Sequence, residues 1–245
     1  MANVLLVHGA WHGGWCWQKL ADELGSRSHA VQAPDMPGHG DDPTPLAEVT
    51  LAGYVRRIVD ACNAFDGPVH LLGHSMGGML ISAAAETAPD RLVQLIYLCA
   101  FVPVDGEPMM AMNAELNRAS ALNGMLRPTD DGLGMLVADE AIEAAFYHDC
   151  SADDVAFARS RLVPQAVEPL GAPASLSAAR FGAVPKAYIE CIEDQAIHIA
   201  AQRALYRRAG IDNVVALDTG HSPFFSAPGA LADAIETLIE GSGPT

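Results

Sequence analysis

The chain alternates between short apolar runs and longer segments in which apolar residues recur at helical spacing. The apolar runs are bounded by turn residues and predict buried strands at Val4–Val7, His29–Ala33, 69–72, Leu92–Cys99, Val184–Cys191 and Asn213–Leu217. The periodic segments predict helices at Trp15–Leu24, Leu51–Phe65, Met79–Ala85, Ala196–Arg208 and Pro228–Ile239. Strands that alternate with helices in this way predict an α/β fold, with a doubly wound, mostly parallel sheet of about six strands.

The alternation stops between residues 103 and 182, where no further strand-like run is found. Five of the nine methionines fall in the first half of this segment: Met109, Met110, Met112, Met125 and Met135. Methionine suits a pliable apolar pocket wall, although core filling explains each one equally well. We expect a helical cap, residues 103–182, inserted into a core formed by residues 1–102 and 183–245. A chain of 245 residues is long enough for one such domain.

The stretch Val69–Ala85 carries the strongest candidate chemistry. Gly73-His74-Ser75-Met76-Gly77 lies between a predicted strand and a predicted helix, which is the setting of the G-x-S-x-G nucleophile turn. A side chain at either glycine would crowd the crossing strand and helix. We therefore expect Ser75 to be a nucleophile; the alternative is a glycine-rich turn whose serine only caps the helix.

A loop after the first strand begins His8-Gly9-Ala10 and lies beside this turn in such a fold. We expect the backbone N–H groups of Ala10 and Met76 to form an oxyanion hole. His8 and His12 could suggest a metal site, but no acidic or cysteine ligand set accompanies them. We expect neither a metal nor an organic cofactor, because a P-loop and a G-x-G-x-x-G turn are also missing.

A serine nucleophile needs a base and an acid, and both follow later in the chain. The order Ser75, Asp194, His221 is the order of a hydrolase triad, with each residue in a loop after a strand. The rival acids are Glu193, Asp218 and Asp105. Asp194 is preferred because of its position within the predicted fold.

Charge and cysteine content limit the classes of binding partner and the cellular compartment that we expect. The chain has 14 basic and 30 acidic residues, a formal net charge of −16, which argues against nucleic acid or an anionic membrane as a partner. The five cysteines are scattered and odd in number, as in a reduced compartment. The N-terminus lacks the layout of a signal peptide, and the longest apolar run, Leu92–Val104, is too short to span a bilayer. We expect a soluble, cytoplasmic protein.

Several motifs together resemble one known family. VHGAWHGGWCW, GHSMGGM, CAFVP, RFGAVPKAYIECIEDQAI and the late TGH are similar to the plant methylesterase and hydroxynitrile lyase group of α/β-hydrolases and to its bacterial carboxylesterase relatives. The resemblance runs nearly end to end and is weakest between residues 105 and 147. It implies the α/β-hydrolase fold, the triad and oxyanion residues named above, and Phe101 as a cavity-lining position. We also expect Gly9 and His74 to contact substrate.

The chain departs from the lyases of this group at two positions. They carry a threonine where Gly9 stands and a lysine where Ser222 stands. We therefore expect a serine carboxylesterase that acts through an acyl-enzyme on small, neutral, hydrophobic esters of the methyl, aryl or pyrethroid type. The alternatives are a carbon–carbon lyase and a ligand receptor on a hydrolase scaffold. Oligomeric state stays open, with a homodimer through the cap or an edge strand as one arrangement.

Overall fold

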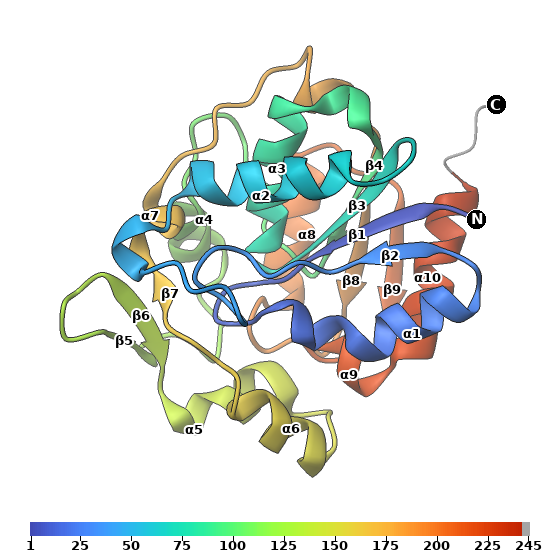
Figure 1. Ribbon diagram of the computed structural model, residues 1–245. Coiled ribbons are helices and arrows are strands. Elements are labelled where there is room, and N and C mark those ends of the chain that lie inside the picture. The colour runs from blue at the N-terminus through green and yellow to red at the C-terminus, as the bar shows by residue number, and fades with distance from the viewer. Residues whose placement is uncertain (242–245) are drawn as a thin grey trace.

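The structure is a computed structural model and describes residues 1–241. Within that range, six strands pair in parallel in the order β2-β1-β3-β4-β8-β9 (Figure 1). They are β1 (Asn3–Val7), β2 (Ala30–Gln32), β3 (Val69–His74), β4 (Leu92–Leu98), β8 (Lys186–Cys191) and β9 (Val214–Leu217). All six coincide with predicted strands, and the α/β prediction is confirmed.

Burial follows position in this sheet. β3 is buried at every residue, and β1 and β8 are buried except at their first residue, which is half-buried. The outer strands β2 and β9 are mostly half-buried or exposed. A parallel strand with helices on both faces has no polar side, so its sequence reads as a continuous apolar run. This is why the central strands were visible in the hydrophobic pattern.

Helices cover both faces of the main sheet. α1 packs against α10 on one face, α2 packs against α3 on the other, and α8 lies on β8 (Figure 1). The α-helices of this core are α1 (Gln18–Ser26), α2 (Leu51–Asn63), α3 (Gly77–Thr87), α8 (Ile199–Arg208), α9 (Pro223–Ser226) and α10 (Pro228–Glu240). Turns of 3-10 helix lie at η1 (Gly14–Trp17), η2 (Leu46–Glu48), η3 (Pro89–Arg91) and η5 (Phe181–Ala183).

The predicted helix Ala196–Arg208 begins three residues later than expected, at Ile199. The N–H groups of Ala196 and Ile197 donate to Oδ1 of Asp194, at 2.7 and 2.9 Å. A side chain that accepts from the backbone two and three residues further on holds a turn and competes with helix formation. These two hydrogen bonds therefore hold Asp194 in its loop and delay the start of the helix.

The prediction that residues 103–182 contain no strand is wrong. Within the described chain, β5 (Leu126–Pro128), β6 (Gly134–Val137) and β7 (Gln165–Ala166) form a three-stranded antiparallel sheet. These strands are too short to stand out in a hydrophobic pattern. The same segment holds α4 (Met109–Leu116), α5 (Asp139–Ile142), the π-helical turn η4 (Glu143–Tyr147), α6 (Ala152–Arg159) and α7 (Val167–Gly171).

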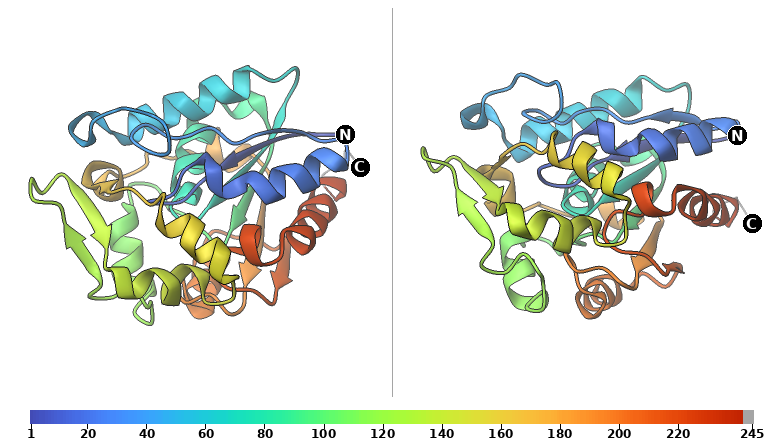
Figure 2. Two further views of the ribbon diagram at one scale, coloured as in Figure 1. Left: turned by 60° about the horizontal axis from the view of Figure 1, so that its bottom comes forward. Right: turned by 90° about the horizontal axis from the view of Figure 1, so that it is seen from below.

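Figure 2 shows residues 103–171, coloured green to yellow, gathered at the end of the main sheet away from the N-terminus. We refer to residues 103–182 as the cap; that they form a unit separate from the core stays a prediction. The strand order reverses at β1, because β2 follows on one side of it and β3 on the other. Loops that leave the carboxyl ends of β1 and β3 diverge there and leave room for a site.

No helix within residues 1–241 is long and apolar enough to cross a membrane. All five cysteines are free thiols, and only Cys150 among them is not fully buried. A disulfide framework therefore plays no part in the described fold.

Candidate active site

The turn between β3 and α3 holds Ser75 in a strained conformation. Its φ is +56°, in the left-handed region that residues other than glycine rarely adopt. A β-carbon at Gly73 would lie 2.5 Å from the carbonyl oxygen of Gly77, and one at Gly77 would lie 2.7 Å from that of Val7. Both glycines are therefore required for α3 to cross β3 and β1 this closely, as the sequence predicted.

The strained backbone is held by hydrogen bonds to β4, to the loop after it and to the first turn of α3. The N–H of Ser75 donates to the carbonyl of Leu98 at 3.2 Å, and the carbonyl of Ser75 accepts from Gly78 and Phe101, both at 3.1 Å. Strain of this kind persists only where the surroundings determine it, and it is concentrated at functional sites. Ser75 thus has the strained backbone expected of a nucleophile turn, and it lines the cavity described below.

Asp194 and His221 form a buried pair in the loops after β8 and β9. Oδ2 of Asp194 lies 2.7 Å from Nδ1 of His221, and each residue is 1% exposed. Gln202 also donates to Oδ2, at 3.2 Å. A carboxylate oxygen only accepts, so Nδ1 of His221 carries the proton and Nε2 is left with a free lone pair.

The three rival acids lie elsewhere. Asp105 accepts the N–H of Leu176 at 2.8 Å, within the cap. Glu193 and Asp218 are exposed. Among the four candidates, only Asp194 bonds the imidazole.

Two rings hold the imidazole of His221. The ring of His74 lies 4.5 Å from it, centroid to centroid, and Nε2 of His74 donates to the carbonyl of His221 at 2.8 Å. The ring of Phe146, from η4 in the cap, lies 5.6 Å away at an interplanar angle of 33°. Because His74 is the chain neighbour of Ser75, this contact also brings the loop of β9 to the nucleophile turn.

His74 is fully buried, and burial holds its pKa well below the usual 6.5, with the adjacent His221 adding to the effect. A neutral His74 places no second positive charge beside His221 when that ring takes up a proton. The structure thus gives His74 a supporting position beside His221. Neither His74 nor Gly9, both expected to contact substrate, is among the residues that line the cavity.

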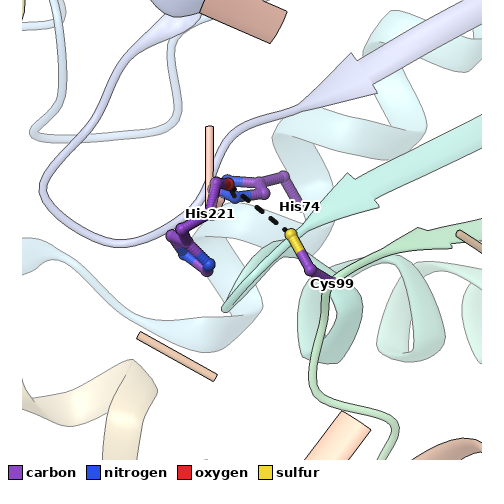
Figure 3. A group of neighbouring side chains, drawn as sticks. All are labelled: His74, Cys99 and His221. Carbon is purple, nitrogen blue, oxygen red and sulfur yellow. Dashed lines mark hydrogen bonds between the residues drawn. The ribbon is translucent and has the colours of Figure 1, made fainter. Parts of the chain in front are cut away.

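His74, Cys99 and His221 gather their donor atoms in one place (Figure 3). Sγ of Cys99 lies 3.6 Å from the carbonyl oxygen of His221. Burial raises the pKa of the Cys99 thiol well above its usual value. Nδ1 of His221 already faces Asp194. The hydrogen bonds of this group hold the β9 loop in place.

The oxyanion-hole candidates meet beside Ser75. Ala10 and Met76 both line the cavity with it, and within residues 1–241 neither backbone N–H donates a hydrogen bond to a protein acceptor. Two unpaired N–H groups next to a nucleophile are what a developing oxyanion needs.

His8 orients the peptide group that carries the Ala10 N–H. Its Nδ1 donates to the carbonyl of Gly9 at 2.8 Å, and its Nε2 accepts from the N–H of Met36 at 3.0 Å. Burial, together with nearby His39, keeps the pKa of His8 well below 6.5, so the ring stays neutral in this tautomer. The carbonyl of Gly9 and the N–H of Ala10 belong to one peptide plane, so His8 fixes the direction of the Ala10 N–H.

His12 is used in a similar way. Its Nδ1 donates to the carbonyl of Ala10 at 2.7 Å, and its Nε2 accepts from the hydroxyl of Tyr147. Burial lowers the pKa of His12 to about 4. Both nitrogens of His8 and of His12 are therefore occupied, which leaves neither residue free to bind a metal.

Ser75 opens into an apolar cavity of about 370 Å³ between the main sheet and the cap. The residues that line it are Ala10, Trp11, Ser75, Met76, Phe101, Met109, Met110, Asn113, Ala114, Leu122, Asn123, Gly124, Leu126, Met135, Val167, Leu170, Ala196 and Ile197. None of these side chains is charged. Phe101 lies in the wall, as the family resemblance implied.

Three of the five cap methionines, Met109, Met110 and Met135, line the cavity, whereas Met112 and Met125 do not. The other cap contributors, such as Asn113 and Val167, were not found from the sequence. Their signal is weak, because the cap elements are short and nothing local shows which of their faces meets the core.

Comparison with known proteins assigns the family. Residues 4–234 match the α/β hydrolase family, so the chain belongs to it. A pyrethroid hydrolase of Sphingobium wenxiniae is 34% identical over 250 residues, covering 98% of this chain and 88% of that protein. Polyneuridine aldehyde esterase of Rauvolfia serpentina is 28% identical over 240 residues, covering 92% and 91%. The crystal structure of a pyrethroid hydrolase from Sphingobium faniae JZ-2 superimposes with a TM-score of 0.88 at 30% identity, covering 98% and 97%.

These relatives are named as hydrolases and esterases, and methylesterases of Arabidopsis thaliana are similar as well. The predicted family is thereby confirmed. The chain takes its place among the carboxylic ester hydrolases of the α/β-hydrolase fold.

Proposed function

We propose that the protein is a serine carboxylesterase that cleaves small, neutral, hydrophobic esters through an acyl-enzyme. The observation that carries this proposal is the convergence of three features on one apolar cavity. These are a strained serine, two unpaired backbone N–H groups beside it, and a buried Asp–His pair whose histidine is supported by the serine's chain neighbour.

In the first step, Nε2 of His221 takes the proton of Ser75 Oγ while Oγ attacks the ester carbonyl carbon. The carbonyl π electrons move to the oxygen, and the N–H groups of Ala10 and Met76 stabilise the resulting oxyanion. When the intermediate collapses, the bond to the alcohol oxygen breaks and His221 protonates the departing alkoxide. An acyl-Ser75 ester remains.

A water molecule then repeats the sequence. His221 takes one of its protons, the hydroxide attacks the acyl carbon, and the bond to Ser75 Oγ breaks with return of the proton to Oγ. Asp194 holds the Nδ1–H tautomer and stabilises the imidazolium in both halves. The products are one alcohol and one carboxylic acid.

The cavity lining sets the substrate class. Its walls are apolar and carry no charged side chain, so an ionised substrate would lose its hydration without gaining a partner. Esters of the kind named for the relatives, such as pyrethroids, and small methyl or aryl esters match this lining. The five free thiols are consistent with action in the cytoplasm.

The two alternative functions find less support. A cyanohydrin lyase of this family carries a lysine where Ser222 stands, and Ser222 is fully buried with no hydrogen-bond partner for Oγ within residues 1–241. A ligand receptor on this scaffold has no need of the strained serine or of the buried Asp–His pair, and the site retains both. Ester hydrolysis uses every feature of the site.

Replacing the nucleophile tests the proposal. Ser75→Ala should abolish hydrolysis of 4-nitrophenyl acetate and butyrate, because no acyl-enzyme can form, while thermal unfolding and ligand-free structure stay as in the wild type. A fluorophosphonate probe should add its mass to the wild type at Ser75 and not label the variant. Full activity in Ser75→Ala, or wild-type labelling at another residue, would rule out this mechanism.

A further inference from the structure

The cavity wall formed by α4 presents one uncommitted polar group. Two residues of the lining, Asn113 and Asn123, carry a side-chain amide. Asn123 lies at the exposed rim, where its Nδ2 donates to the carbonyls of Asn117 and Arg118 at 3.3 and 2.7 Å. Asn113 is half-buried and faces an otherwise apolar wall.

The orientation of Asn113 follows from that of its neighbour Asn117, one turn further along the chain. Nδ2 of Asn117 donates to the carbonyl of Ala196 at 2.7 Å, and its Oδ1 accepts from the N–H of His198 at 3.1 Å. A backbone carbonyl only accepts and a backbone N–H only donates, so the amide of Asn117 has one assignment. Asn117 is 1% exposed, which leaves no room for another.

The second hydrogen of Asn117 Nδ2 then goes to Asn113. The distance from this nitrogen to Oδ1 of Asn113 is 2.9 Å. The oxygen of Asn113 is thereby used, and its Nδ2 lies on the opposite side of the amide. Within residues 1–241, that Nδ2 has no hydrogen-bond partner, although Asn113 belongs to the cavity lining.

We propose that Asn113 is a specificity-determining residue: its Nδ2 donates a hydrogen bond to a second oxygen of the substrate, apart from the reacting ester. The preferred substrates are then neutral esters that are apolar except for one ether, ketone or further ester oxygen. This inference rests on the proposed esterase function. The fixed Asn117 amide holds the donor in place before substrate enters, so little side-chain ordering accompanies binding.

The selectivity comes from the contrast between one donor and an apolar wall. An ether oxygen that enters an apolar cavity loses its hydrogen bond to water, which weakens binding. A hydrogen bond from Asn113 offsets that loss at one distance from the ester and nowhere else. The net contribution of a hydrogen bond between uncharged groups corresponds to roughly a three- to tenfold change in kcat/KM.

Matched pairs of esters test this. Two series are used, 4-nitrophenyl alkanoates and alkyl acetates, in which one methylene is replaced by oxygen at successive positions of the acyl chain or of the alcohol. For each pair, the measured quantity is the ratio of kcat/KM for the ether ester to that for the all-carbon ester. In the wild type the ratio should peak at one position in one series.

Asn113→Leu and Asn113→Asp should each lower that peak ratio roughly three- to tenfold. Leucine is apolar and similar in volume, and aspartate keeps the oxygen that accepts from Asn117 but loses the donor. Asn123→Leu is the matched control and should leave the ratio as in the wild type. The all-carbon esters report folding and basal activity of each variant.

The outcomes are separable. A wild type with no peak in either series, or a peak that survives in both Asn113 variants, would overturn the role of Asn113 while leaving the esterase intact. A wild type that hydrolyses none of the esters would overturn the proposed function itself.

Discussion

At the scale of single residues, the protonation pattern around His221 depends on one carboxylate. Oδ1 of Asp194 accepts two backbone N–H groups, and Oδ2 faces Nδ1 of His221. The two oxygens therefore have separate tasks: one holds the loop and the other selects the tautomer of the base.

Asp194→Asn should lower kcat roughly 10⁴-fold, the effect of the same exchange in serine proteases. The amide oxygen must take the place of Oδ1, because Ala196 and Ile197 donate there, so the amide NH₂ turns toward His221. Nδ1 then accepts, the proton moves to Nε2, and the ring can no longer take the proton of Ser75. Steady-state kinetics measure the loss.

The control for this exchange is Asp105→Asn, whose carboxylate bonds only the N–H of Leu176. Its kcat should stay within a few-fold of the wild type. A large loss in Asp105→Asn with full activity in Asp194→Asn would mean that the acid has been misassigned.

At the scale of elements, the π-helical turn η4 connects the cap to the loops after β1 and β9. Phe146 packs on the rings of His221, Trp11 and His12, and the next residue, Tyr147, donates its hydroxyl to His12. Single π-helical turns are rare in proteins, and those that occur are often found at functional sites. Both consecutive aromatic side chains of this turn contact the ring of His12.

Phe146→Ala should destabilise the fold by about 3–5 kcal/mol, the usual cost of removing a buried phenylalanine ring. The residue is 1% exposed, so the space left would not be filled by small movements. The kcat should fall as well, because His221 loses one of the rings that hold it. Chemical denaturation and kinetics are the two measurements.

Phe146→Leu, which keeps most of the volume, should lose less on both counts. Phe157→Ala, a half-buried phenylalanine of α6 whose ring packs on Trp15, serves as a cap control and should leave kcat near the wild type. Unchanged kcat in a folded Phe146→Ala would show that the cap does not position the base.

At the scale of the whole molecule, neutral buried histidines make stability depend on pH. His8, His12, His39 and His74 are all buried, and burial lowers the pKa of each below the usual 6.5, to about 4 for His12 and His39. In the unfolded chain the same rings take up protons below about pH 6.5. The protein therefore takes up protons when it unfolds at a pH between about 4 and 6.5.

By linkage, this contribution to the free energy of unfolding is present above pH 6.5 and is lost as the pH falls toward 4. A single ring with pKa values of 6.5 unfolded and about 4 folded gives a loss of about 2 kcal/mol at pH 5. Urea denaturation at pH 7 and pH 5 should show a marked loss of stability at the lower pH.

His39→Gln isolates one ring outside the catalytic residues. It should be less stable than the wild type at pH 7, but its loss between pH 7 and pH 5 should be smaller by about 2 kcal/mol. The exposed His148→Gln is the matched control and should keep the wild-type pH dependence. An equal pH dependence in His39→Gln and wild type would contradict this account.

The sequence by itself determined the main sheet and the candidate nucleophile. Central parallel strands are buried on both faces and read as apolar runs, and the turn at Ser75 needs glycine at Gly73 and Gly77 for steric reasons. The order of Ser75, Asp194 and His221 along the chain was enough to predict the Asp–His pair, because loops after parallel strands meet at one edge of the sheet.

Only the tertiary structure determined the strands of the cap and the contacts of the cap side chains. The strands of the cap are two to four residues long and pair with partners that local sequence does not identify. The direction of the Asn113 amide is set through Asn117 by the carbonyl of Ala196, 79 residues further along the chain from Asn117. Backbone conformation depends largely on neighbouring residues in the sequence. The orientation of a polar side chain depends on which distant groups the fold brings within hydrogen-bond distance.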